Sequence, residues 1–196
     1  MKKFTSVFLS LFIAAPYLYA QTTTWIADKA HSRVQFAVSH LVIAEVTGRF
    51  KDFDVTLEQT KEDFTDSKIK AVIKTASIDT DNEFRDKDLR SDNFLNAEKY
   101  PEMVFKSTSF EETGKDTYKI NGDLTIRDIT KSVVLDAKLR GTIKDPYGNT
   151  RGGFKATTSI NRFEFGAKWN KTIEGGGLVA GETVEITLLM EFVKQK

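Results

Sequence analysis

The two histidines, His31 and His40, come first because an imidazole can act as a base or bind a metal. They bracket a stretch of alternating residues, so in an extended strand they face opposite sides and lie about 30 Å apart. They therefore cannot share one metal ion. Ser32 follows His31 directly, and neighbouring side chains on a strand point away from each other, which excludes a Ser–His pair. We expect His31 to be a polar anchor at the rim of the fold.

Three acidic residues, Asp79, Asp81 and Glu83, superficially resemble a calcium loop. Such a loop needs glycine at its sixth position and glutamate at its twelfth, where this chain has Phe84 and Arg90. The carboxylates are better explained as charges at the start of a helix. The chain has no cysteine, which excludes a thiol nucleophile and a lipoprotein anchor. We therefore expect a protein that is not an enzyme, with no catalytic residue, no metal and no cofactor.

A short helix should position a cluster of charged residues. Thr80 as N-cap and Glu83 three residues later form a capping box, which predicts a helix from about Asp81 to Leu89. Its charges are either a solvated face or a polar lid at the mouth of a barrel. Under a lid, Phe84, Leu89, Phe94 and Leu95 would face inward. The candidate residues for contact with a ligand head group are His31, Phe84, Arg85, Asp88, Arg90 and Phe94.

Alternation of apolar and polar residues with a period of two dominates the rest of the chain. Strands of this kind form antiparallel sheet with one face in water. Asn121-Gly122 is normally a hairpin signal, but the apolar residues stay in phase across it, so we predict a continuous strand with a glycine bend. The turn is then expected at 127–130. The alternating runs are 33–39, 53–58, 68–74, 133–140, 154–160 and 184–191.

About eight to ten strands and one short helix predict an all-β fold, a closed antiparallel barrel of about eight strands, because closure removes exposed sheet edges. A barrel of this size can fill itself with side chains or hold one small ligand. Periodicity supports inward-facing positions but does not separate a cavity wall from a filled core. The predicted apolar lining is Phe36, Val38, Phe50, Phe105, Leu124, Leu135, Phe154, Ile160, Phe165 and Leu188.

The first 20 residues have the pattern of a cleavable signal peptide, with Lys2-Lys3, an apolar run over 4–15 and a small residue at Ala20. The run is shorter than the roughly 20 residues that span a bilayer. Residues 21–196 then form a single domain, which we expect in the periplasm or, as a second choice, secreted. The 29 basic and 28 acidic residues nearly balance, which argues against a nucleic-acid partner.

Short motifs extend from about Thr24 to Phe192, and in this order they resemble the YceI-like, polyisoprenoid-binding protein family. The resemblance implies a lipocalin-like extended barrel with a helix beside its mouth. It also implies a non-catalytic, periplasmic or secreted carrier of amphiphilic lipids (isoprenoid chains, isoprenoid quinones or fatty amides), and often a homodimer. The motifs are Asp28-x-x-His31-Ser32, Gly48-x-Phe50, Arg85-Asp86-x-x-Leu89-Arg90-Ser91-x-x-Phe94, Tyr100-Pro101, Phe105-x-Ser107, Gly122-x-Leu124-Thr125-Ile126-Arg127, Arg162-x-x-Phe165-Gly166 and Gly181-x-x-Val184.

Two positions depart from the family pattern. The helix motif usually reads Arg-Asp-x-His-Leu-Arg, and Asp88 replaces the histidine here; Asp128 stands where glycine usually follows Leu-Thr-Ile-Arg. An ionised aspartate only accepts hydrogen bonds. An anionic diphosphate is therefore disfavoured beside Asp88 unless Arg85 or Arg90 compensates, and we expect a neutral or weakly polar head group.

Three functions are compatible with the sequence. The first is a lipid carrier that transports or sequesters a long-chain ligand in its interior. The second is a filled, stress-protective barrel that binds a partner on its outer face. The third is a lipid-modifying enzyme, for which no nucleophile–base pair or metal set is found in the sequence. A cavity inside the barrel would separate the first from the second.

Overall fold

The computed structural model describes residues 21–196, so the predicted signal peptide, 1–20, lies outside the described residues. The fold consists of strands, one α-helix and two short 3₁₀ turns, at Thr75–Ser77 and Arg162–Phe165. The helix, α1, is Glu83–Arg90. The strands are β1 (Thr23–Ala27), β2 (Arg33–His40), β3 (Ala44–Phe50), β4 (Phe53–Gln59), β5 (Lys68–Lys74), β6 (Ile78–Asp79), β7 (Glu102–Gly114), β8 (Thr117–Ile126), β9 (Ile129–Lys144), β10 (Thr150–Asn161) and β11 (Ala180–Lys194).

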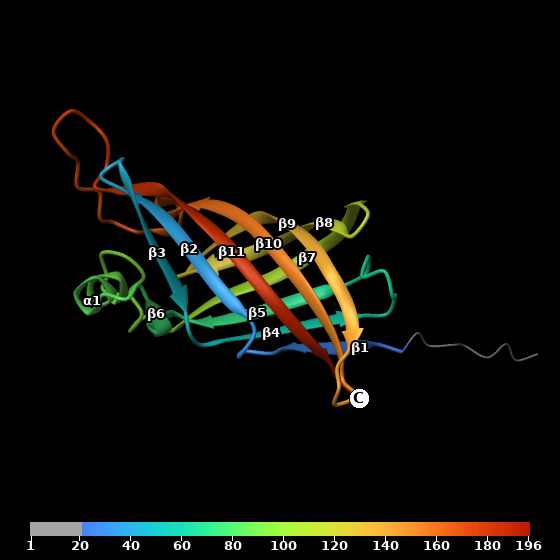
Figure 1. Cartoon of the computed structure of the whole chain (residues 1–196). Coiled ribbons are helices and arrows are strands. Elements are labelled where there is room, and N and C mark those ends of the chain that lie inside the picture. Colours follow the sequence, from blue (N-terminus) through green and yellow to red (C-terminus); the bar gives the residue numbers. More distant parts are fainter. Residues whose placement is uncertain (1–20) are drawn as a thin grey trace, which may run out of the picture.

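The strands form one antiparallel sheet in the order β1-β4-β5-β7-β8-β9-β10-β11-β2-β3-β6. A further pairing of β1 with the end of β11, Trp25 opposite Lys194, closes eight of these strands into a barrel. The earlier part of β11 pairs with β2 instead, so β2, β3 and β6 extend the wall beyond the closed ring (Figure 1). The predicted closed antiparallel barrel of about eight strands is confirmed.

The strands follow the alternation of the sequence. In β4, for example, Phe53, Val55 and Leu57 are buried, whereas Asp54 and Glu58 are exposed. The buried side chains point into the barrel and the polar ones face water, which is the arrangement that period-two patterning specifies. The hydrophobic effect therefore selects the register of each strand.

The predicted continuous strand across Gly122 is also confirmed. Residues 117–126 form β8, and the chain turns at Arg127–Asp128 before β9 begins at Ile129. A Cβ atom at position 122 would overlap the ring of Phe105 and the Lys106 carbonyl. Glycine is therefore required here for the close approach of the Phe105 ring, and the ladder has an irregularity opposite it, between Ser107 and Ser109.

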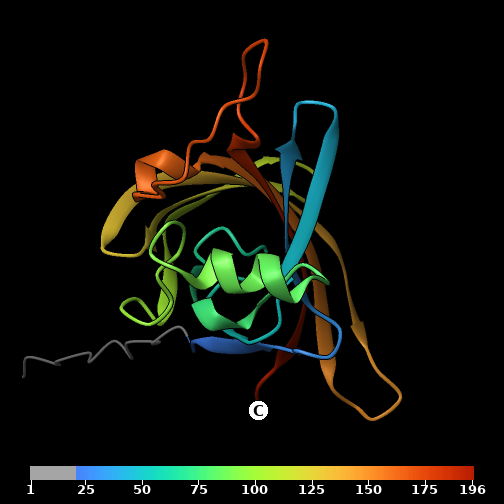
Figure 2. The ribbon, with the colours of Figure 1, turned by 90° about the vertical axis from the view of Figure 1, so that its left-hand side faces the viewer.

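The helix begins two residues later than predicted, and the predicted capping box is wrong. Asn82 is the N-cap, and its side chain accepts a hydrogen bond from the Arg85 amide at 3.0 Å. Asp81 has a left-handed φ of 57°, which is incompatible with the first helical turn. Thr80 instead donates its backbone N–H and its hydroxyl to the buried carboxylate of Asp86. This contact fixes α1 across one end of the barrel (Figure 2).

Aromatic side chains fill the other end of the barrel interior. The ring of Phe154 lies 5.2 Å from that of Phe64, 6.1 Å from that of Phe192 and 6.4 Å from that of Tyr118. Trp25 packs on Phe64 with ring centroids 5.9 Å apart. All of these side chains are buried, so we call this group the aromatic floor.

Candidate ligand-binding cavity

The barrel encloses a cavity of about 400 Å³ between the aromatic floor and α1. Phe154 and Phe192 of the floor line its inner end. We call its other end, lined by Arg85, Asp88, Phe94 and Trp169, the mouth. The barrel is therefore hollow between the mouth and the floor and packed at the floor, where the five aromatic side chains contact one another.

The structure places all ten predicted lining residues on the cavity wall. They come from strands around the whole barrel and its extension, because the inward face of each strand is apolar. Aliphatic side chains from the same faces complete the wall, including Val133, Ile186 and Met190. The placement follows the prediction; that these residues bind a ligand stays a prediction.

A glycine shapes one part of the wall. The Phe36 ring lies against Gly48 on the neighbouring strand, and a Cβ at position 48 would overlap this ring and the Thr80 methyl group. The Phe50 ring lies 5.7 Å from that of Phe36. Gly48 thus lets the Phe36 ring lie back against the wall and leaves the space in front of it free.

The mouth combines aromatic and charged side chains. The rings of Phe94 and Trp169 lie 5.8 Å apart. Arg85 donates from Nε to the Thr80 hydroxyl at 2.8 Å and from Nη2 to the Thr80 carbonyl at 2.7 Å. Asp88 is exposed on α1 and accepts a long hydrogen bond, 3.4 Å, from Ser91. The predicted polar lid therefore combines hydrogen-bond donors and acceptors with aromatic side chains at the opening of the cavity.

Three predicted mouth residues do not line the cavity. Arg90 donates to the carbonyls of Ala76 and Ile78 and so ties α1 to the preceding chain. Phe84 is 92% exposed and lies on a different face of α1 from Leu89, which lines the cavity, because the two are five residues apart. His31 lies on the turn between β1 and β2, where it interacts with Asp28 at 3.0 Å, away from the mouth. These three placements correct the prediction.

Arg162 is the mouth-side residue that the candidate set missed. Its side chain lines the cavity and the residue is only 8% exposed. The guanidinium donates to three carbonyls, those of Gly181, Trp169 and Ala180, at 2.7–2.9 Å. Burial lowers the pKa of Arg162, and the carbonyl dipoles satisfy its donors. Its place in the motif Arg162-x-x-Phe165-Gly166 was the available signal.

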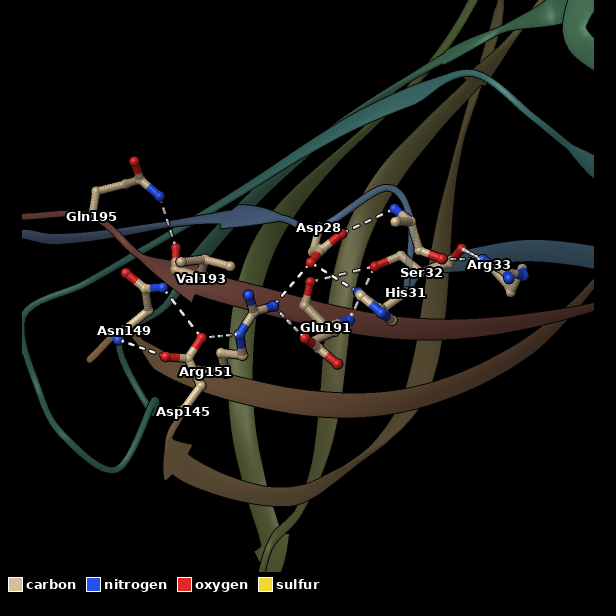
Figure 3. A network of polar contacts seen from close by, with 11 residues as sticks. Asp28, His31, Ser32, Arg33, Asp145, Asn149, Arg151, Glu191, Val193 and Gln195 are labelled. Carbon is tan, nitrogen blue, oxygen red and sulfur yellow. Dashed lines mark hydrogen bonds and ion pairs between the residues drawn. The ribbon is translucent and has the colours of Figure 1, made fainter. Parts of the chain in front are cut away.

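A second polar cluster joins the segment that follows β1 to β10 and β11 (Figure 3). The ligand atoms of Asp28, His31 and Glu191 lie within 4.8 Å of one another, a spacing that a metal could use. However, Arg151 Nη1 lies 2.9 Å from Asp28 and 2.5 Å from Glu191, and its Nε lies 2.7 Å from Asp145. The Arg151 guanidinium already lies between these carboxylates and pairs with each of them, so we assign the cluster to stability.

The same cluster predicts a loss of stability in acid. Hydrogen bonds from His31 and Arg151 lower the pKa of Asp28 to about 2, and Arg151 lowers the pKa of Asp145 to about 2, from an ordinary value of 3.8. Because these pKa values are depressed in the folded state, the stabilisation is full above about pH 4 and is lost as the pH falls through 2. We expect the melting temperature, followed by circular dichroism, to fall over this range.

The variant Asp145→Asn should lose part of this acid dependence, since the altered side chain no longer titrates. Asp136→Asn is the matched control, because Asp136 forms an exposed ion pair with Lys119. An acid transition in Asp145→Asn identical to that of the unaltered protein would contradict this assignment.

The fold and the cavity define a class, the closed antiparallel β-barrels with an apolar interior and a helix at the mouth. The chain belongs to the YceI-like domain family, whose model matches residues 25–192. It is 41% identical to a UPF0312 protein of Ectopseudomonas mendocina (strain ymp) over 165 residues, 84% of this chain and 83% of that protein. The family resemblance expected from the sequence is confirmed.

Two solved structures illustrate the likeness. The Campylobacter jejuni YCEI protein is 31% identical, with a TM-score of 0.69 over 81% of this chain and 90% of that one. A polyisoprenoid binding domain from Saccharophagus degradans has a TM-score of 0.66 at 12% identity, over 87% of this chain and 98% of that one, which shows the fold alone. No helix within residues 21–196 has the length and apolar character needed to cross a membrane.

Proposed function

We propose that the protein binds one long-chain amphiphilic lipid inside the barrel, without chemical change, and transports or sequesters it in the periplasm. The apolar cavity is the observation that carries this proposal. Each methylene group transferred from water to such an interior contributes about 0.8 kcal/mol, so a long chain binds without specific polar contacts. The groups at the mouth then need only set the depth and orientation of the ligand.

Family membership supports the ligand class. The Saccharophagus degradans relative of the same fold is described as a polyisoprenoid binding domain. An isoprenoid, an isoprenoid quinone or a fatty amide shares the required chemistry, a long apolar chain with a small polar end. The periplasmic location rests on the predicted signal peptide at 1–20.

The geometry gives less support to the two alternative functions, a stress-protective module and a lipid-modifying enzyme. A barrel filled with side chains is the premise of the stress-protective module, and the cavity removes that premise. For an enzyme, the Ser32 hydroxyl would need a base, but it hydrogen-bonds the backbone of Glu191. The imidazole of His31 pairs with Asp28 instead. We therefore favour binding over catalysis.

We further propose that the head group is neutral with acceptor oxygens, such as a quinone or an amide carbonyl. Arg85 lines the mouth, and its two hydrogen bonds to Thr80 use Nε and Nη2 and leave Nη1 as a donor. The exposed carboxylate of Asp88 beside it disfavours a multiply charged anion. Arg90 does not compensate, because it does not line the cavity and its side chain instead binds the carbonyls of Ala76 and Ile78. A single carbonyl oxygen matches this arrangement better than a diphosphate.

Mass spectrometry of the lipid extracted from the purified protein tests this assignment. We expect neutral long-chain lipids to be enriched over a matched extract of Leu124→Trp, in which the cavity is blocked. Recovery of prenyl phosphates alone would show that the head-group assignment is wrong.

A further inference from the structure

The turn between β2 and β3 consists of three consecutive apolar residues, Leu41, Val42 and Ile43, which we call the apolar tip. Their exposed fractions are 37%, 66% and 88%. Polar residues and glycine are the usual choice at such a turn, and a run of exposed apolar residues indicates a function. Leu41 and Val42 also have left-handed φ angles of 52° and 66°, which are unfavourable for non-glycine residues and most costly for the β-branched Val42.

The apolar tip lies at the mouth end of the barrel (Figures 1 and 2). The Leu41 amide donates to the carbonyl of Val179 at 2.9 Å, and both Val179 and the neighbouring His40 line the cavity. The tip therefore borders residues of the cavity wall at the mouth. The helix α1 lies at the same end and adds Phe84, which is 92% exposed.

We infer that the apolar tip and Phe84 dock the mouth of the barrel on a lipid bilayer, with their side chains inserted among the acyl chains. This inference rests on the proposed function. A long-chain lipid resides in a bilayer because its transfer to water is unfavourable for every methylene group. A mouth that touches the bilayer lets the chain enter the cavity without crossing water.

The charges around the apolar tip fit a neutral, zwitterionic surface. Glu45, Lys171 and Glu174 are exposed beside it and carry both signs. The segment with Lys171 and Glu174 packs close to the tip, since a Cβ at Gly177 would lie 3.0 Å from the Val42 side chain. Such a mixed surface gains little from an anionic membrane, so apolar insertion must supply the attachment, and binding should depend little on salt.

Flotation with phosphatidylcholine vesicles at low and high salt tests the inference on the mature full chain. We expect the unaltered protein to float at both salt concentrations. The double variant Val42→Ser/Ile43→Ser should bind at least about tenfold more weakly, because two apolar side chains no longer insert. The matched control is Ile143→Ser/Tyr147→Ser, which removes two residues exposed to 64% and 88% at the other end of the barrel.

Failure of the unaltered protein to float, or equal binding by the tip and control variants, would overturn the inference. The inference would also be overturned if the tip variant changed its oligomeric state while the unaltered protein did not bind vesicles. The tip would then be a contact between copies of the chain. Uptake of a fluorescent long-chain alkyl probe from detergent distinguishes failure of the docking inference from failure of the proposed function. The tip variant should keep uptake from detergent and lose transfer from vesicles, whereas absent uptake by the unaltered protein would count against the cavity itself.

Discussion

Replacing Leu124 with tryptophan should weaken the binding of a long-chain lipid by at least about tenfold, because the indole takes cavity space from the chain and each excluded methylene group forfeits about 0.8 kcal/mol. Leu124 lies on β8 and lines the cavity, where it is only partly buried against the core. The larger ring therefore projects into the space that the ligand needs. Displacement of a fluorescent alkyl probe by lipid measures the affinity, and thermal unfolding should change little.

Val134→Trp is the matched control for this substitution. Val134 lies on the adjacent strand β9, opposite Asn121 of β8, and is 41% exposed on the outer face of the barrel. The same large side chain placed there leaves the cavity unchanged, so the affinity should stay at that of the unaltered protein. Equal affinities of Leu124→Trp and Val134→Trp would show that the ligand does not occupy the cavity.

Replacing Phe154 with alanine should lower the free energy of unfolding by about 3–5 kcal/mol. Phe154 is buried and its ring contacts those of Phe64, Tyr118 and Phe192, so its removal opens a void in the aromatic floor. The void joins the cavity, because Phe154 also lines its inner end. Chemical denaturation measures the loss, and the enlarged cavity should accept longer chains than before.

Phe84→Ala removes the same number of atoms from an exposed ring and is the control for stability. Because Phe84 is 92% exposed on α1, the free energy of unfolding should change by no more than about 0.5 kcal/mol. If Phe154→Ala destabilised the protein no more than Phe84→Ala, the aromatic floor would not be the packed part of the barrel.

The inward-facing residues could be predicted because alternation along a strand is a local property. Phe36, Phe105 and Leu188 are far apart in the sequence, yet each lies on the apolar face of its strand, and closure of the barrel brings all such faces to one interior. The in-phase apolar residues on both sides of Gly122 likewise predicted an unbroken β8. Neither pattern predicts the volume of the cavity, because this volume depends on how the side chains pack.

The start of the helix could not be predicted from the local pattern. Thr80 and Glu83 have the spacing of a capping box, but the Thr80 hydroxyl instead donates to the buried carboxylate of Asp86. The N-cap of the helix is therefore Asn82. The spacing of residues in the sequence does not predict a competing tertiary contact of this kind.

Two further residues depended on contacts between distant segments. His31 was expected at the mouth, but pairing of β1 with the end of β11 places it beside Asp28, away from the mouth. Arg162 was not among the candidates because its acceptors, the carbonyls of Trp169, Ala180 and Gly181, belong to a loop and a strand start that carry no pattern. The split pairing of β11 with β1 and β2 decides both positions.

Native mass spectrometry of purified residues 21–196 tests the central claim, that the hollow barrel holds one lipid. We predict that the intact protein carries one noncovalent mass increment in the range of a long-chain lipid, released by organic solvent and absent from Leu124→Trp. A protein that shows only its bare mass, and takes up no long-chain lipid when one is offered in detergent, would contradict the claim.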